Sequence, residues 1–323
     1  RLLDNNQKIT VYAIHKEPRT FEKYAKKLEK YENVAKIYVY KFDENIDFPQ
    51  LEKAHVSEAT YYRLMIENYI PKEIDNLIYL DSDVIAMNNP YDSCKHVLDD
   101  LNKMGEIVGV STEMFNSKKN EHFKNIELTG YKYFNAGVMF IDYKKWRENN
   151  LKLTFLDKVE RYKDVIKLWD QDILNNYFNG EYYEISSLLN FRLNTNNNLE
   201  FLKNNVIFYH FSGDHKPWLL KGSLDDTAKI FFDIYSELDE RKYYFERKTG
   251  RALFLKMLTK KQLKLYKFLQ EYKEHNEIMP KFDEMREHMN VKSKNTIHQM
   301  LGYIEWKGYI KRYPAHERAI KII

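Results

Sequence analysis

The chain has 323 residues, of which 43% are hydrophobic and 15% aromatic, and a formal net charge of +4. It contains no apolar run long enough to span a membrane, and its single cysteine, Cys94, excludes an internal disulfide and a structural zinc cluster. The length exceeds what one hydrophobic core usually serves, so we expect two domains. A lone thiol fits a reducing, cytoplasmic setting.

The charge is distributed unevenly along the chain. Residues 251–323 hold 16 Lys+Arg against 8 Asp+Glu, a balance of +8, and the first 250 residues hold 36 against 40, a balance of −4. This asymmetry predicts that the basic appendage meets a polyanion, whereas the acidic body does not. A solvated lysine-rich surface is the alternative.

The first seventy residues alternate between strand and helix patterns. The chain opens on Arg1 without a methionine or signal peptide, and we expect a fragment or a processed product. Residues 1–6 resemble the last turn of a helix, and the strand 9–14, the helix 21–31 and the strand 37–40 follow. Such alternation predicts an α/β fold with a mainly parallel sheet covered on both faces.

Two carboxylates end the next apolar strand. Ser57 can cap a helix that carries Arg63 and stops before Pro71, and the strand 77–85 then contains Asp81 and Asp83. Residues i and i+2 of an extended chain point to the same side, so both carboxylates could reach one cation. An isolated Asp-x-Asp more often caps a helix or stabilises a turn.

Further polar residues follow predicted strands downstream. We expect a helix at 92–103, a strand at 107–110 and a lid or insertion at 111–130. A strand at 138–141 is expected to follow Asn135-Ala136-Gly137.

The last part of this region is expected to bring a histidine to the site. Asp170 is placed as the N-cap of a helix that closes at Gly180, and the strand 206–209 ends at His210. An amphipathic helix is expected over residues 223–238.

Two carboxylates and an imidazole suit a divalent cation. Oxygen and nitrogen ligands from Asp81, Asp83 and His210 favour Mn²⁺ over Ca²⁺ and leave open positions for diphosphate oxygens. Lys216 follows in a glycine- and proline-containing loop and can place its charge on that diphosphate. A histidine in this position could equally be a hydrogen-bonded core residue.

Four motifs in the first part of the chain resemble those of glycosyltransferase family 8. The motifs are Leu80-Asp81-Ser82-Asp83, Tyr133-Phe134-Asn135-Ala136-Gly137, Asp170-Gln171-Asp172-Ile173-Leu174-Asn175 and His210-x-x-Gly213-x-x-Lys216-Pro217-Trp218. The resemblance covers residues 1–240. It implies a GT-A fold and retaining transfer of a hexose from a UDP-sugar to a glycan or lipopolysaccharide-type acceptor.

The same resemblance implies roles for individual residues. Asp81, Asp83 and His210 would bind Mn²⁺ or Mg²⁺. The donor sugar would be held by Arg63, Asn135, Gly137, Asp170 and Gln171, and the diphosphate by Gly213, Lys216 and Trp218.

The route to retention is open. Front-face departure uses a diphosphate oxygen as base and needs no protein nucleophile, and we favour it over a covalent route through Asp170 or Gln171. The family normally begins with a strand and an Ala-x-Asp-x-Asn-type turn that hold uracil and ribose. Residues 1–6 match only the end of the helix after that turn, so we expect this half of the donor site to be absent from the sequence.

The chain changes character after an expected linker at 241–254. Thr259-Lys260-Lys261-Gln262 is a capping-box pattern. Helices are expected near 282–289 and 293–306, followed by a hairpin over 309–323. This order outlines a winged helix-turn-helix domain at 255–323.

These residues resemble the DNA-binding domain of the LexA repressor family. The resemblance is carried by Leu258-Thr259-x-x-Gln262, Met279-Pro280, Ser293-x-Asn295, Lys307-Gly308-Tyr309-Ile310 and Arg318-Ala319-Ile320. It implies contacts with duplex DNA by Ser293, Lys294, Asn295, Thr296, His298, Gln299, Lys311 and Arg312, since Asn and Gln can read adenine edges. The alternatives are a winged helix used for protein contact, and a transcriptional regulator whose first domain senses sugar nucleotides.

Overall fold

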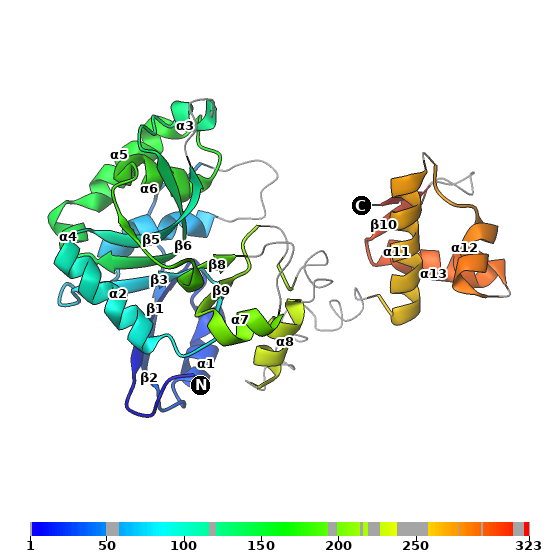
Figure 1. The fold of residues 1–323 in the computed structure, drawn as a ribbon, viewed down its shortest axis with the longest axis horizontal. Helices are drawn as coiled ribbons and strands as arrows, with labels where there is room; N and C mark the ends of the chain where they lie inside the picture. The colour runs from blue at the N-terminus through cyan, green and yellow to red at the C-terminus, as the bar shows by residue number, and fades with distance from the viewer. Residues whose placement is uncertain are drawn as a thin grey trace. The chain divides into compact units, whose positions relative to one another are not determined.

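The computed structural model describes residues 2–49, 58–115, 121–192, 199–213, 216–218, 227–237, 258–276, 278–291, 293–312 and 320–322. The chain divides into two compact units, residues 1–227 and 228–323 (Figure 1). The predicted linker at 241–254 lies outside the described residues, so the domain limits of 240 and 255 stay predictions.

The first unit begins with a parallel strand pair. Strands β1 (Ile9–His15) and β2 (Val34–Lys41) pair in parallel, and helix α1 (Arg19–Leu28) connects them. Residues 2–6 form a bend and a turn, so the helical turn predicted there is wrong. Asn33 holds this segment, because its side-chain amide donates to the carbonyls of Asp4 and Gln7.

A four-stranded sheet forms the centre of this unit, in the order β3-β6-β5-β7. Its strands are β3 (Asn76–Leu80), β5 (Val108–Phe115), β6 (Lys132–Asp142) and β7 (Tyr183–Glu184). β6 runs antiparallel to both β3 and β5, and β5 pairs in parallel with β7. The expected α/β class is confirmed, but the sheet is mixed rather than mainly parallel, because β6 lies antiparallel between two neighbours.

A second, smaller sheet brings the ends of three strands together. Strands β4 (Val84–Ala86), β9 (Phe208–His210) and β8 (Phe191–Arg192) lie in the order β4-β9-β8. β4 is antiparallel to β9, and β8 is parallel to it. The strand predicted over 77–85 is therefore two strands, β3 and β4, which belong to different sheets.

Further helices complete this unit, and those that begin at Tyr91, Tyr143 and Trp169 pack on the central sheet. These further helices are α2 (Tyr91–Met104), α3 (Glu121–Asn125), α4 (Tyr143–Glu148), α5 (Leu151–Tyr162), α6 (Trp169–Phe178) and α7 (Leu199–Asn205). The segment Glu58–Asn68 is a 3-10 helix, and Ser57, its predicted cap, lies outside the described residues. Trp146, Phe155 and Tyr61 are fully buried in the resulting core.

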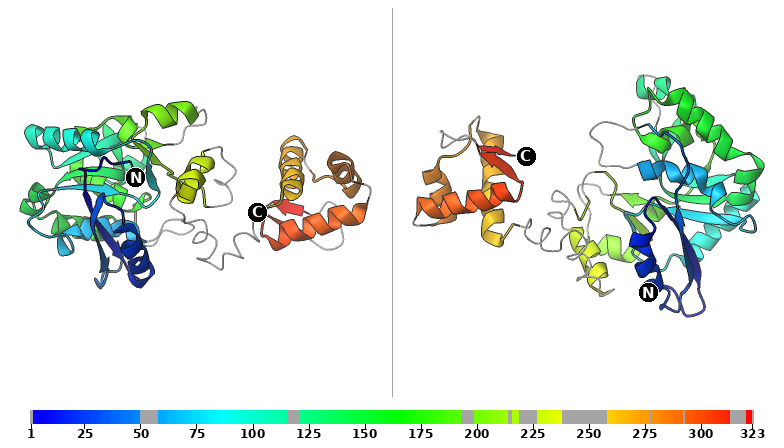
Figure 2. Two further views of the ribbon diagram at one scale, coloured as in Figure 1. Left: turned by 90° about the horizontal axis from the view of Figure 1, so that it is seen from below. Right: turned by 180° about the vertical axis from the view of Figure 1, so that it is seen from behind.

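The second unit contains helices and a hairpin. Helix α8 (Ala228–Glu237) falls in this unit, followed by α11 (Lys260–His275), α12 (Phe282–Met289), α13 (Lys294–Trp306) and the antiparallel strands β10 (Ile310–Arg312) and β11 (Ile320–Ile322). The predicted capping box of Thr259 and Gln262 is present. The hairpin lies beside α13, with α12 at the other end of the three-helix group (Figures 1 and 2), which confirms the winged helix outline.

Across the described part of the chain, every helix is too short or too polar to cross a membrane.

Candidate active site

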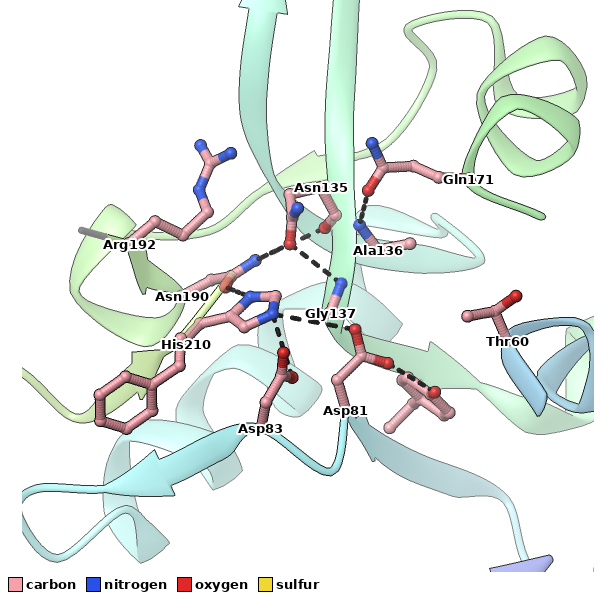
Figure 3. Close-up of polar contacts among 12 residues, drawn as sticks. Thr60, Asp81, Asp83, Asn135, Ala136, Gly137, Gln171, Asn190, Arg192 and His210 are labelled. Carbon is pink, nitrogen blue, oxygen red and sulfur yellow. Dashed lines mark hydrogen bonds and ion pairs between the residues drawn. The ribbon is translucent and has the colours of Figure 1, made fainter. Parts of the chain in front are cut away.

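Two acidic residues flank the turn between the two sheets of the first unit. Asp81 directly follows β3, and its backbone N–H donates to the carbonyl of Gly137 on β6. Asp83 precedes β4, whose first residue, Val84, is the register partner of His210 on β9. Strand pairing thus places the three predicted metal ligands together, with their ligand atoms within 4.8 Å of one another (Figure 3).

The donor atoms at this cluster fit a divalent cation. His210 Nε2 lies 3.3 Å from Asp83 Oδ1 and 3.8 Å from Asp81 Oδ2. Asp83 Oδ1 is buried and, apart from its 3.3 Å contact with His210 Nε2, has no hydrogen-bond partner among the described residues. A buried carboxylate oxygen without a partner is costly, and a cation would satisfy it. Two carboxylates and one imidazole are ligands that Mn²⁺ accepts.

Asp83 is held in its charged form by its neighbours. Its burial opposes ionisation, but contacts with His210 and Lys216 outweigh burial and lower its pKa. The Lys216 ammonium contacts Asp83 Oδ2 and donates to the carbonyl of Phe211 at 2.6 Å. Lys216 therefore lies at the edge of the cluster, where its charge can meet an anionic ligand.

Gly137 makes room for the histidine. A Cβ built on Gly137 would lie 2.1 Å from Cε1 and 2.6 Å from Nδ1 of the His210 ring. The imidazole thus packs directly on the main chain of β6. Gly213, by contrast, has open space around it among the described residues, and its φ of +77° is the feature that favours glycine there.

Amide side chains connect the histidine to β6. Asn190 is 2% exposed. Its Oδ1 lies 3.0 Å from His210 Nδ1, and its Nδ2 donates to Asn135 Oδ1 at 3.0 Å (Figure 3). Asn135 Oδ1 also accepts from the backbone N–H of Gly137 at 3.0 Å.

A buried arginine lies on the other side of the cluster. Arg63, on the 3-10 helix, is 5% exposed and donates from Nη2 to Asp81 Oδ1 at 2.8 Å. Its Nε is 2.7 Å from Asp170 Oδ2, while the Nε–H is directed at the carbonyl of Thr60. The guanidinium also lies over the ring of Tyr79, 4.1 Å from its centroid. Arg63 thus holds the two acidic residues at fixed positions.

Asp170 is 2% exposed, and burial raises its pKa to about 7 against the opposing effect of Arg63. It is the second residue of α6 rather than its N-cap, so that prediction is wrong. The residue before it, Trp169, has a φ of +50°, a conformation that costs on the order of 1 kcal/mol in a residue other than glycine. Asp170, which pairs with Arg63, directly follows this strained residue.

Asp172, rather than Asp170, accepts hydrogen bonds from the backbone N–H groups before α6. Its Oδ2 accepts from the backbone N–H groups of Lys167 and Leu168 at 2.7 and 2.9 Å. Its Oδ1 accepts from Tyr133 Oη at 2.6 Å and lies 3.0 Å from His122 Nε2. The carboxylate is therefore a structural anchor of α6.

Gln171 points toward β6 and β5. Its Oε1 accepts from the backbone N–H of Ala136 at 3.0 Å, and its Nε2 donates to Glu113 Oε2 at 3.2 Å. Asn135 Nδ2 also donates to Glu113 Oε2, at 3.2 Å. Arg192 forms an ion pair with Glu113 Oε1. Glu113 thus joins the two predicted sugar-binding amides.

A cleft of about 470 Å³ opens beside this group. It is lined by polar residues with one aromatic ring and one thioether: Ser111, Thr112, Glu113, Met114, Ser187, Asn190, Phe191, Arg192 and Ser212. Such a lining offers hydroxyl, carboxylate and guanidinium groups to a polar ligand.

The structure brings most of the predicted site residues together. Contacts link Arg63, Asp81, Asp83, Asn135, Gly137, Asp170, Gln171, His210 and Lys216 directly or through one neighbour. Gly213 and Trp218 lie on the segment around Lys216, exposed and half-buried respectively.

The residues predicted to contact DNA lie on α13 and the hairpin. Ser293 caps α13 by accepting from the backbone N–H of Asn295 at 3.1 Å. Lys294 pairs with Asp283 at 2.7 Å, Arg312 pairs with Glu305 at 2.7 Å, and His298 stacks on Phe282. Asn295, Gln299 and Lys311 are exposed, and Thr296 is half-buried.

Three residues of this site, Asn190, Glu113 and Arg192, were not predicted from the sequence. Glu113 and Arg192 are isolated charges in stretches without a recognisable motif. Asn190 lies between the apolar residues Leu189 and Phe191, and a polar residue in such a stretch is the only signal that could have marked it.

Comparisons with known proteins agree with this geometry. The family described as Glycosyl transferase family 8 matches residues 2–222, and the LexA DNA binding domain matches residues 255–319. A crystal structure of an active-site variant of LgtC has a TM-score of 0.52 and 24% identity, over 71% of this chain and 95% of that one. That likeness shows the predicted GT-A fold.

Curated relatives match each part of the chain. A Haemophilus influenzae protein is 33% identical over 185 residues, 55% of this chain and 54% of its own length. A lipopolysaccharide 1,2-glucosyltransferase of Escherichia coli is 29% identical, over 67% of both chains. A LexA repressor of Erythrobacter litoralis is 40% identical over 67 residues, 21% of this chain and 29% of that one. The chain thus spans about half the length of the first of these relatives.

Proposed function

The chain belongs to glycosyltransferase family 8, and from this membership we propose that it transfers a hexose from a UDP-sugar to a glycan or lipopolysaccharide-type acceptor. The observation that carries the proposal is the cluster of Asp81, Asp83 and His210, with the unsatisfied oxygen of Asp83 facing it. The name of the Escherichia coli relative, a lipopolysaccharide 1,2-glucosyltransferase, supports the acceptor class.

Asp81, Asp83 and His210 would hold Mn²⁺ or Mg²⁺. When bound, such an ion acts as a Lewis acid on the diphosphate leaving group. Lys216 adds a positive charge on the same side, since it contacts Asp83. The leaving group is then stabilised by groups that are fixed before the donor arrives.

The donor sugar would lie among Arg63, Asn135, Asp170 and Gln171. Gln171 and Asn135 offer amides suited to sugar hydroxyls, and Glu113 fixes both amides through its carboxylate. Asp170 is buried and its carboxylate pairs with Arg63, which disfavours its use as a nucleophile toward the sugar. This environment supports front-face transfer with retention, in which a diphosphate oxygen is the base.

The acceptor would enter the cleft lined by Glu113 and Arg192. Its wall also includes Asn190, which contacts His210, so the cleft adjoins the metal cluster. Hydroxyl groups and the ring of Phe191 suit a carbohydrate rather than an apolar ligand.

We further propose that the second unit binds duplex DNA. The match to the LexA DNA binding domain over residues 255–319 supports this, together with exposed Asn295, Gln299 and Lys311. A regulator with a sugar-nucleotide-sensing first unit is the second candidate function. The two functions differ in whether the bound donor is consumed.

The direct test is release of UDP from a panel of UDP-hexoses by the full chain, with Mn²⁺ and with a chelator. We expect UDP release from at least one donor, dependent on Mn²⁺ and stimulated by lipopolysaccharide core acceptors. Tight donor binding without turnover would favour the sensing regulator. The absence of both binding and turnover would reject the proposed donor site.

A further inference from the structure

Asn190 occupies a buried position between the metal cluster and the predicted sugar site. It follows a short 3-10 turn (Ser187–Leu189) and precedes β8, which pairs in parallel with β9 and aligns Arg192 with His210. Its side chain spans the space from His210 to Asn135 (Figure 3). No motif marks this residue, and its role rests on its hydrogen bonds.

The direction of each hydrogen bond in this group can be deduced from one backbone group. The N–H of Gly137 can only donate, so the atom of Asn135 that receives it at 3.0 Å is the carbonyl Oδ1. Asn190 approaches the same Oδ1 at 3.0 Å and must therefore present its amide Nδ2 there. Its own Oδ1 is then left to face His210.

This order fixes the proton on the imidazole. Asn190 Oδ1 is an acceptor 3.0 Å from His210 Nδ1, so Nδ1 must carry a hydrogen. In a neutral ring the lone pair is then on Nε2, which faces Asp81 and Asp83. A metal needs that lone pair.

The carboxylates alone would favour the opposite arrangement. In the absence of a cation, Asp83 Oδ1 at 3.3 Å would attract a hydrogen on Nε2, and that tautomer cannot ligate a metal through Nε2. We infer that Asn190 is a positioning residue, which imposes the Nδ1–H tautomer on His210 and so presents Nε2 to a divalent cation. The inference rests on the proposed metal site, and the hydrogen-bond chain from Gly137 is its structural basis.

Two other features keep the His210 ring in the orientation that presents Nε2 to a cation. The His210 ring lies directly against the main chain of Gly137, so it has no room to move toward β6. Asn190 is itself 2% exposed, so water cannot readily replace its carbonyl. Hydrogen bonds of this kind to a metal-binding histidine commonly change metal affinity by about 10- to 100-fold.

The tautomer of His210 can be determined directly by NMR, without measuring turnover. The full chain is labelled with ¹⁵N-histidine, and long-range ¹H–¹⁵N spectra are recorded without metal at pH 8.5, well above the ordinary imidazole pKa of about 6.5. His210 is assigned by its absence in H210Q. The variants are N190L, which removes the acceptor, and N190D, which keeps an acceptor opposite Nδ1.

We expect Nδ1–H in the parent, a shift to Nε2–H in N190L, and Nδ1–H restored in N190D. Binding of Mn²⁺ alone, followed by the paramagnetic resonance of the free ion, should weaken about 10- to 100-fold in N190L and recover in N190D. N88L is the matched control, because Asn88 donates to the carbonyls of Lys203 and Val206 before β9 and has no contact with the cluster in the described structure.

Three results would overturn the inference: a parent ring with Nε2–H, a ring protonated on both nitrogens at pH 8.5, or Nδ1–H retained in N190L. A change in N88L equal to that in N190L would also overturn it, since the effect would then be general destabilisation. A parent with the expected tautomer that binds no Mn²⁺ would reject the proposed metal site and leave the role of Asn190 toward His210 supported.

Discussion

At Gly137, the lack of a side chain allows the His210 ring to lie against β6. We predict that G137A displaces the ring, lowers the free energy of unfolding of the first unit by about 1–3 kcal/mol, and weakens Mn²⁺ binding at least about tenfold. The physical reason is that the added Cβ would lie only 2.1 Å from His210 Cε1, far inside van der Waals contact. Calorimetric titration with Mn²⁺ and urea unfolding measure the two effects.

The control for this variant is G213A. A Cβ added at Gly213 would meet no atom of the described residues within 4 Å, but the φ of +77° makes alanine strained there by about 1 kcal/mol. If both variants weaken Mn²⁺ binding equally, contact between Gly137 and His210 is not the cause.

Asp170 gives the site an expected pH dependence. Burial raises its pKa to about 7, so the carboxylate form increases as the pH rises from 6 to 8. If charged Asp170 stabilises developing positive charge on the sugar, turnover in the parent should rise over this range. D170N should lower kcat by about a hundredfold or more and remove the rise. Parallel pH profiles in the parent and D170N would contradict this role. The control is D142N, which alters a buried carboxylate at the far end of β6.

At the level of single residues, motifs identified the groups that have specific chemistry. Asp81, Asp83 and His210 were expected to meet, and the strand register brings them together. Asn190 and Glu113 could not be predicted, because their importance comes from the partners that folding gives them rather than from their own sequence context.

At the level of elements, the start of α6 depends on one buried carboxylate. Burial opposes the ionisation of Asp172, but its hydrogen bonds from His122, Tyr133 and two backbone N–H groups lower its pKa below the ordinary 3.8. The charged form therefore stabilises the native state above about pH 4. That contribution is lost as the pH falls below 3.8 toward the lowered value.

We predict that D172N destabilises the first unit by about 2 kcal/mol at pH 7. The difference from the parent should shrink as the pH falls below about 4. Urea unfolding can be followed by tryptophan fluorescence in a W306F background, because Trp146, Trp169 and Trp218 are the remaining tryptophans and all precede residue 228. A difference that grows toward low pH would show that Asp172 is not stabilised in its charged form.

The elements themselves were predicted better than their pairing. The ranges expected for β1, α2, α12 and α13 agree closely with the structure, because apolar periodicity and caps are local signals. The direction of β6 and the break between β3 and β4 depend on neighbours far along the chain. For the same reason the stretch 111–130, predicted as an irregular lid or insertion, in fact continues β5 to Phe115 and contains α3.

At the level of the whole molecule, we expect two separable binding activities, for a nucleotide sugar in the first unit and for duplex DNA in the second. Duplex DNA should bind to the full chain with an affinity that falls as salt rises. Lys311 is exposed on β10, where its ammonium can contact a phosphate group. K311A should weaken binding and reduce the logarithmic salt slope by about one. Fluorescence anisotropy measures this, and a flat salt response would indicate a protein-contact module.

We propose that Asp81, Asp83 and His210 form a metal-dependent nucleotide-sugar site. The most direct measurement is calorimetric titration of the full chain with UDP, with and without Mn²⁺, for the parent, D83N and the control D142N. We expect Mn²⁺ to strengthen UDP binding in the parent and D142N and to have no effect in D83N. Equal UDP binding by parent and D83N in the presence of Mn²⁺ would contradict the claim.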